Sequence, residues 1–115
     1  MDERLEKAFQ TANYMTTLSS QRKIALEELQ QKLVYYYNGA SFTVSKELIT
    51  FISTLHTLGN SSTVILDDNS IPVKIENTQD FLNNILATFY EAMNEYYVKY
   101  TSIKTKRKVE DLINV

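Results

Sequence analysis

The 115-residue chain contains no cysteine, no tryptophan, one proline and two glycines. The absence of cysteine excludes disulfides, thiolate catalysis and cysteine-ligated zinc. It is also typical of proteins in a reducing compartment. Two glycines are too few for a glycine-rich loop that cradles phosphate. Because glycine and proline interrupt regular structure, we expect a few long elements, most of them helices.

Charge of either sign is also not in large excess. The chain has 12 basic and 14 acidic residues, a net charge of -2, which differs from the strongly basic balance of a dedicated nucleic-acid binder. No apolar run approaches the ~18 residues needed to span a bilayer. The N-terminus, MDERLEKAFQ, is acidic and amphipathic, unlike a signal peptide. We therefore expect a single domain, residues 1–115, in a cytoplasm, with no membrane partner.

The first 37 residues contain neither glycine nor proline. Steps of three and four residues pick out a heptad stripe that is mostly apolar, consisting of Leu5, Ala8, Ala12, Met15, Ser19, Arg22, Leu26, Leu29, Leu33 and Tyr36. This spacing predicts one long helix over residues 1–37. Asn38 and Gly39 are residue types that end helices in a left-handed conformation.

A second stripe of the same kind follows a cap at Asn77, consisting of Leu82, Leu86, Phe89, Met93, Tyr96, Tyr100 and Ile103. It predicts a helix over residues 78–108, with residues 109–115 out of phase as a tail. An antiparallel pairing of the two helices puts Ala12 opposite Ile103 and Ser19 opposite the region of Tyr96 and Tyr100. Small side chains would then face large ones.

The insert between these helices, residues 38–77, has two patterns. Helical spacing of apolar residues predicts a short helix over 45–59, closed by Gly59. Two β-branched runs flank Asp67 to Ser70 and predict a β-hairpin over 63–76. The expected fold is mainly α with a small β-hairpin, in which two long antiparallel helices form a coiled-coil hairpin joined by the insert.

Few residues could act in catalysis or bind a metal ion, and each of them also has a structural interpretation. His56 lacks a partner nucleophile or a second metal ligand, and Asp67 and Asp68 lack the spacing of a calcium loop. Four helix carboxylates resemble the ligands of metal-binding bundles but lack an E-x-x-H motif, namely Glu27, Glu28, Glu91 and Glu95. We therefore expect no catalytic residue, cofactor or metal site, and no enzymatic activity.

Tyrosine is unusually frequent, with eight copies, six of which are clustered at residues 35–37 and 96–100. Tyrosine suits interfaces because its ring is apolar and its hydroxyl can stay in water. We expect Tyr36 and Tyr96 in the core. The candidate interface consists of Tyr35, Tyr37, Tyr97, Ile71, Val73 and Ile75. Apolar residues outside the stripes also need covering, which predicts a homo-oligomer, with a core-only role for the tyrosines as the alternative.

A basic patch near the C-terminus consists of Lys99, Lys104, Lys106, Arg107 and Lys108. It predicts one of two things. The patch either pairs with the acidic start of the chain, at Asp2, Glu3 and Glu6, or binds phosphates of a nucleic acid. Nucleic-acid binding is therefore the alternative function.

The sequence resembles two kinds of known protein. The order helix, β-hairpin, helix is similar to that of prefoldin subunits, which implies hairpin-mediated assembly and client-holding coiled coils; the short insert helix departs from that pattern. Residues 65–113 resemble the C-terminal part of small proteins of marine tailed phages, on Asp67, Pro72, Val73, Asn94, Tyr96, Tyr100, Arg107 and Val109. That resemblance implies a virion component or a modulator of host machinery, in the host cytoplasm or virion. The expected function is a non-enzymatic, homo-oligomeric interaction or assembly protein.

Overall fold

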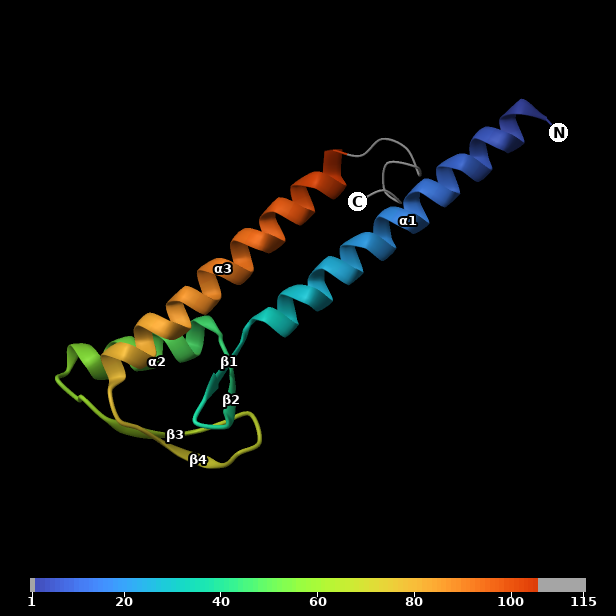
Figure 1. Cartoon of the computed structure of the whole chain (residues 1–115). Helices are drawn as coiled ribbons and strands as arrows, with labels where there is room; N and C mark the ends of the chain where they lie inside the picture. The colour runs from blue at the N-terminus through green and yellow to red at the C-terminus, as the bar shows by residue number, and fades with distance from the viewer. Residues whose placement is uncertain (1, 106–115) are drawn as a thin grey trace. The chain divides into compact units, whose positions relative to one another are not determined.

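A computed structural model describes residues 2–105, and these residues are mainly helical, as predicted. The elements in chain order are α1 (Glu3–Lys32), β1 (Val34–Tyr37), β2 (Ala40–Thr43), α2 (Lys46–Thr57), β3 (Thr63–Leu66), β4 (Pro72–Ile75) and α3 (Thr78–Thr105) (Figure 1). The long first and last helices fit the predicted helical hairpin. The chain divides into two compact units. We call residues 1–29 with 94–115 the helical unit, and residues 30–93 the central unit.

The end of the first helix was predicted wrongly. Helix α1 ends at Lys32, and residues 34–37 instead form β1, paired antiparallel with β2 through a turn at Asn38 and Gly39. Both turn residues have positive φ, at 49° and 80°, as a tight two-residue hairpin turn requires. Valine and three consecutive tyrosines favour a strand over a helical turn. The insert therefore contains two hairpins where one was expected.

The other elements of the central unit follow the prediction. Helix α2 begins after Ser45, whose hydroxyl accepts a hydrogen bond from the Leu48 N–H at 3.1 Å, and Gly59 follows its end with φ +86°. Strands β3 and β4 pair antiparallel as a hairpin. The Asn77 side chain accepts hydrogen bonds from the N–H groups of Gln79 and Asp80, so it caps α3 as expected.

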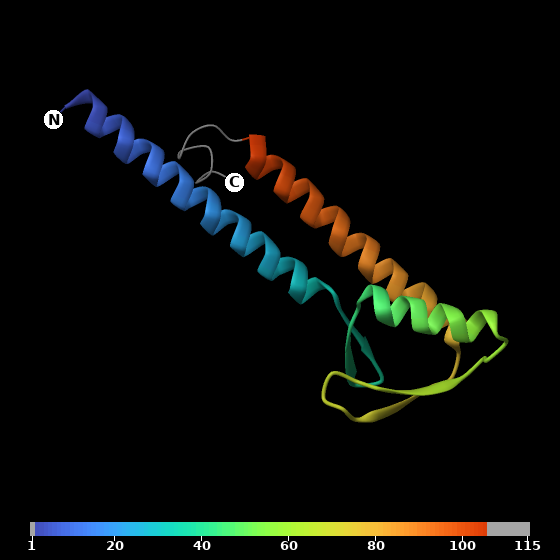
Figure 2. The same ribbon diagram turned by 180° about the vertical axis from the view of Figure 1, so that it is seen from behind.

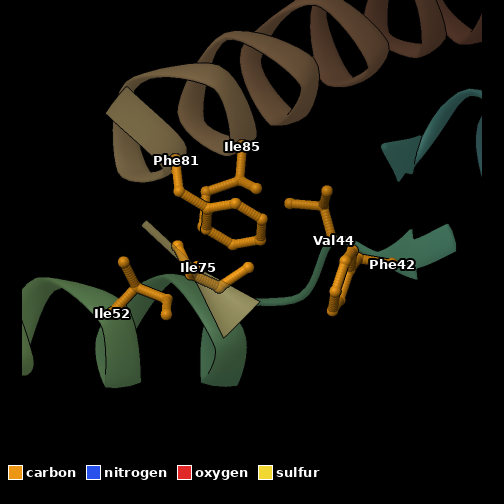
Figure 3. Packing of buried hydrophobic residues seen from close by; sticks show 6 residues of the cluster. All are labelled: Phe42, Val44, Ile52, Ile75, Phe81 and Ile85. Atoms are coloured by element: carbon orange, nitrogen blue, oxygen red, sulfur yellow. The ribbon is translucent and has the colours of Figure 1, made fainter. Parts of the chain in front are cut away.

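The core of the central unit is built from α2, α3, β2 and β4 (Figure 3). Its buried side chains are Phe42, Val44, Ile52, Ile75, Phe81 and Ile85. In Figure 2, α2 lies in front of the first turns of α3, and both hairpins lie below it. The Phe81 ring lies at the centre of this core. The rings of Tyr35, Tyr37 and Phe42 are edge-on to it, at centroid distances of 5.6, 5.6 and 5.3 Å.

This core corrects part of the candidate interface. Tyr35 and Tyr37 lie on one face of β1 and pack on Phe81, and Ile75 has no exposed surface. Tyr36, expected in the core, is 72% exposed because alternate residues of a strand point to opposite faces. The tyrosine cluster therefore supplies two core rings and one surface ring.

The turn between β3 and β4 joins the two hairpins. The Asp67 carboxylate accepts hydrogen bonds from the N–H groups of Asn69 and Ile71, both at 2.9 Å, which confirms the predicted turn chemistry. Asp68 faces strand β2. Its carboxylate accepts from the Thr43 N–H at 2.9 Å and from the Thr43 hydroxyl at 3.0 Å, while its own N–H donates to the Ser41 carbonyl. Asp68 thus occupies the outer edge of β2.

Replacing Asp68 with alanine is expected to lower the free energy of unfolding of the central unit by about 1 kcal/mol, because two hydrogen bonds to a solvent-exposed carboxylate are lost. Urea denaturation followed by far-UV circular dichroism measures the loss. Asp68→Asn keeps one acceptor oxygen and is the matched control, for which we expect a smaller loss. Equal midpoints for the wild type and Asp68→Ala would show that Asp68 does not join the hairpins.

In the helical unit α1 and the last turns of α3 run antiparallel, but the predicted register is wrong. Ile103 is buried with Leu18 and Ala25, and Ala12 is exposed. Burial along this part of α1 follows a heptad pattern one residue earlier than the predicted stripe, with Tyr14, Leu18, Gln21, Ala25 and Glu28 buried or half-buried. One residue corresponds to a rotation of about 100° about the helix axis.

Arg22 gives a physical reason for this rotation. The predicted seam would have buried its guanidinium, which is costly without a charged partner. In the structure Arg22 is exposed at the border of the seam, where its guanidinium lies over the Tyr100 ring, 5.5 Å from the centroid. Six residues further along α1, the half-exposed Glu28 carboxylate accepts a hydrogen bond from the Lys99 ammonium. Arg22 and Glu28 are thereby both matched without being buried.

Candidate interaction surface

The rotation of α1 leaves its apolar heptad stripe uncovered. We define the α1 stripe as the exposed heptad positions of the helical unit other than Arg22, whose guanidinium lies over the Tyr100 ring, namely Leu5, Ala8, Ala12, Met15, Ser19 and Leu26. Leu5 is 47% exposed, Met15 is 57% exposed and Leu26 is 43% exposed. The whole first part of α1, residues 3–13, is exposed. A helix is stabilised mainly by burying an apolar face, so this one lacks the packing that an amphipathic helix needs.

Two large side chains widen this surface. Phe9 and Ile24 lie outside the stripe and are each about half exposed. The sequence identified both as residues that need covering, together with Phe81, Ile85 and Tyr90. Phe81 and Ile85 are in the core of the central unit, whereas Tyr90 is exposed.

The helical unit has a second uncharged surface on α3. Tyr97 is 71% exposed and Val98 is 66% exposed, with the exposed Asn94 and Thr101 one turn away on either side of Tyr97. Tyr97 belongs to the predicted interface, and its ring is available to a partner. Tyr96, by contrast, is half-buried, with its ring 6.0 Å from that of Tyr100. Neighbouring tyrosines on α3 therefore differ in role because they lie on different faces of the helix.

The candidate interface residues of the hairpin are separated by the strand alternation. Ile75 is buried and Val73 is half-buried against the core, whereas Ile71, just before β4, is 55% exposed. The residues that are exposed in β3 are Val64 and Leu66, at 57% and 62%. Neither residue belongs to the interface predicted from the sequence. The signal was present, because Val64 and Leu66 alternate with Ile65, which packs on the core.

The basic patch is only partly within the described residues. Lys99 is paired with Glu28, and Lys104 is exposed in the last turn of α3. Lys106, Arg107 and Lys108 lie outside the described residues, as does the predicted tail 109–115. Of the two lysines of the patch that lie within residues 2–105, Lys99 is in this ion pair and Lys104 is not.

The residues weighed for catalysis or metal binding do not come together. His56 is exposed in the last turn of α2, where a basic side chain suits the negative end of the helix dipole. Glu28 is paired with Lys99, while Glu27 and Glu91 are exposed. Within residues 2–105, no group of three or more histidine and acidic side chains could hold a metal ion.

Comparison with known proteins adds no function. Among the described residues, no helix has the length and apolar character needed to cross a membrane. The chain matches no protein-family model, no curated protein and no solved structure.

Proposed function

We propose that this chain is a non-enzymatic interaction or assembly protein that functions as a homo-oligomer, with the α1 stripe as its main contact surface. The observation that supports the proposal most strongly is that α1 packs on α3 through one heptad pattern while the large apolar residues of a second heptad pattern, Leu5, Met15 and Leu26, are exposed. The proposed site of action is a cytoplasm or, for a phage-encoded protein, a virion.

The spacing of the α1 stripe favours a helix as the partner surface. Alternating steps of three and four residues are the pattern by which one helix packs against another in a coiled coil. Leu5, Met15 and Leu26 are spread along most of the helix, which suits a long contact with a second helix better than a small pocket. The small stripe positions, such as Ala8 and Ala12, allow two helix backbones to approach closely.

A second copy of α1 fits this pattern in an antiparallel arrangement. If Met15 faces Ser19 of the second copy, the heptad spacing places Ala8 opposite Leu26. Both pairs join a large side chain to a small one, so the stripe complements itself in volume. A contact that uses the same residues on both copies is the usual geometry of a homodimer.

Nucleic-acid binding, the alternative, gains no support from the described residues. Lys99 is engaged by Glu28, and Lys104 alone does not form the cluster of cations that tracks a phosphate backbone.

Sedimentation equilibrium of the wild-type chain at micromolar concentration tests the proposal, and we expect a mass above that of one chain. Met15→Lys is expected to raise the dissociation constant at least about tenfold, because a charge would enter an apolar contact. Ser20→Lys adds the same charge at an exposed position of α1 outside the stripe and should leave association unchanged. A monomeric wild type, or equal losses from both variants, would refute the proposal.

A further inference from the structure

The β3–β4 hairpin leaves one edge of its sheet open. The Asp67 N–H donates to the Ile71 carbonyl at 2.9 Å, and pairs in an antiparallel ladder alternate between hydrogen-bonded and non-hydrogen-bonded types. Ile65 and Val73 are therefore a hydrogen-bonded pair. Leu66 with Pro72, and Val64 with Lys74, are the other type, whose backbone groups point away from the ladder. Within residues 2–105, the backbone N–H and C=O groups of Val64 and Leu66 make no hydrogen bond outside the hairpin.

The outer edges of β4 and β2 are protected from pairing with another strand, whereas the outer edge of β3 is not. On β4 the outward positions are Pro72, which has no N–H, and Lys74, which carries a charge. On β2 the outward Ser41 carbonyl and the outward Thr43 N–H are bonded to Asp68. Strand β3, with the sequence TVIL, has neither proline nor charge. An edge of this kind is a template for another strand.

We infer that β3 pairs antiparallel with β3 of a second copy, about a two-fold axis at Ile65. Val64 would face Leu66 of the other copy, and each such pair would exchange both N–H···O=C bonds, about four bonds in all. The result is a continuous sheet in the order β4, β3, β3, β4. The exposed side chains of Val64 and Leu66 from both copies would then cover one another on the outer face.

The charges at the end of β3 favour a second copy in this orientation. Asp68 is engaged by β2, but in the antiparallel pairing Asp67 lies opposite Thr63 of the other copy, whose hydroxyl can donate to its carboxylate. A parallel pairing would place these acidic residues beside their own copies, where like charges repel. The hairpin is thus complementary to itself in backbone groups, apolar side chains and charge. This inference rests on the proposed self-association and adds a second contact within the central unit.

Single cysteines test the pairing, since the natural chain has none. We would prepare Val64→Cys and Leu66→Cys chains and oxidise them mildly, separately and as an equal mixture. Residues facing each other in a hydrogen-bonded pair have Cα atoms about 5.5 Å apart, within the range that a disulfide spans. The mixture should therefore give several-fold more disulfide-linked dimer than either variant alone. Leu58→Cys, at a residue that is 71% exposed and outside the strands, is the control for random collision.

The outcomes separate this inference from the proposed function. If the wild type sediments as an oligomer but the mixture links no faster than Leu58→Cys, β3 pairing is refuted and self-association stands. If Val64→Cys alone links as fast as the mixture, the antiparallel register is wrong. If the wild type is a monomer and no dimer links preferentially, both fail. Circular dichroism of each variant establishes that it is folded, as expected for changes at two exposed side chains.

Discussion

Replacing Phe81 with alanine is expected to lower the free energy of unfolding of the central unit by about 3–5 kcal/mol, the range for removing a buried phenylalanine. Phe81 is 1% exposed, and its ring meets the edge-on rings of Tyr35, Tyr37 and Phe42. The truncation removes all three ring contacts and leaves a cavity between them. A small domain is stable by only about 5–15 kcal/mol, so a large fraction of its stability would be lost.

Urea denaturation, followed by far-UV circular dichroism and tyrosine fluorescence, measures this loss. Phe51→Ala is the matched control, because Phe51 lies on α2, is 50% exposed and has no place in the buried cluster. We expect the control to cost less than about 1 kcal/mol. Equal losses for the two variants would show that Phe81 does not hold the hairpins and helices of the central unit together.

The second prediction compares two adjacent residues of α1 under the same substitution. Ala25→Lys is expected to destabilise the helical unit by about 2–4 kcal/mol, because Ala25 is 4% exposed in the seam with Leu18 and Ile103 and has no room for a charged side chain. Leu26→Lys should leave the folded monomer nearly unchanged, since Leu26 is 43% exposed, but it should weaken self-association at least about tenfold.

Two measurements separate these effects. Urea denaturation at a concentration where the chain is monomeric reports the fold, and sedimentation equilibrium reports association. We expect Ala25→Lys to lower the free energy of unfolding. We expect Leu26→Lys to weaken association and leave the free energy of unfolding nearly unchanged. Exchanged results would mean that α1 packs on α3 through the predicted stripe after all, and that the exposed stripe is not a contact surface.

Local signals in the sequence predicted much of the central unit. The cap at Asn77, the turn at Asp67 to Ser70 and the apolar period of α2 each depend on a few neighbouring residues. The propensities of Val34 to Tyr37 and the Asn38–Gly39 turn are local signals too. They were read as the end of a helix because the heptad period of α1 runs on to Tyr36. The hairpin forms because Tyr35 and Tyr37 can then pack on Phe81, about fifty residues further along the chain.

The candidate surface was predictable in composition but not in place. Exposed Tyr97 and the apolar excess on α1 were both anticipated, whereas Ile75 was assigned to the surface and belongs to the core. A strand has two faces, and alternation shows which residues share a face without showing which face is covered. The same limit explains why Val64 and Leu66 were passed over.

The sequence by itself determined the helix-rich class, the long first and last helices, the caps and the β3–β4 hairpin, because each follows from propensity, periodicity or turn chemistry within a short stretch of chain. The tertiary structure alone decided which side of α1 meets α3. Two heptad patterns one residue apart compete on that helix, and the choice depends on Arg22, Glu28 and their contacts with Tyr100 and Lys99, which are remote in sequence. That choice leaves the apolar α1 stripe exposed.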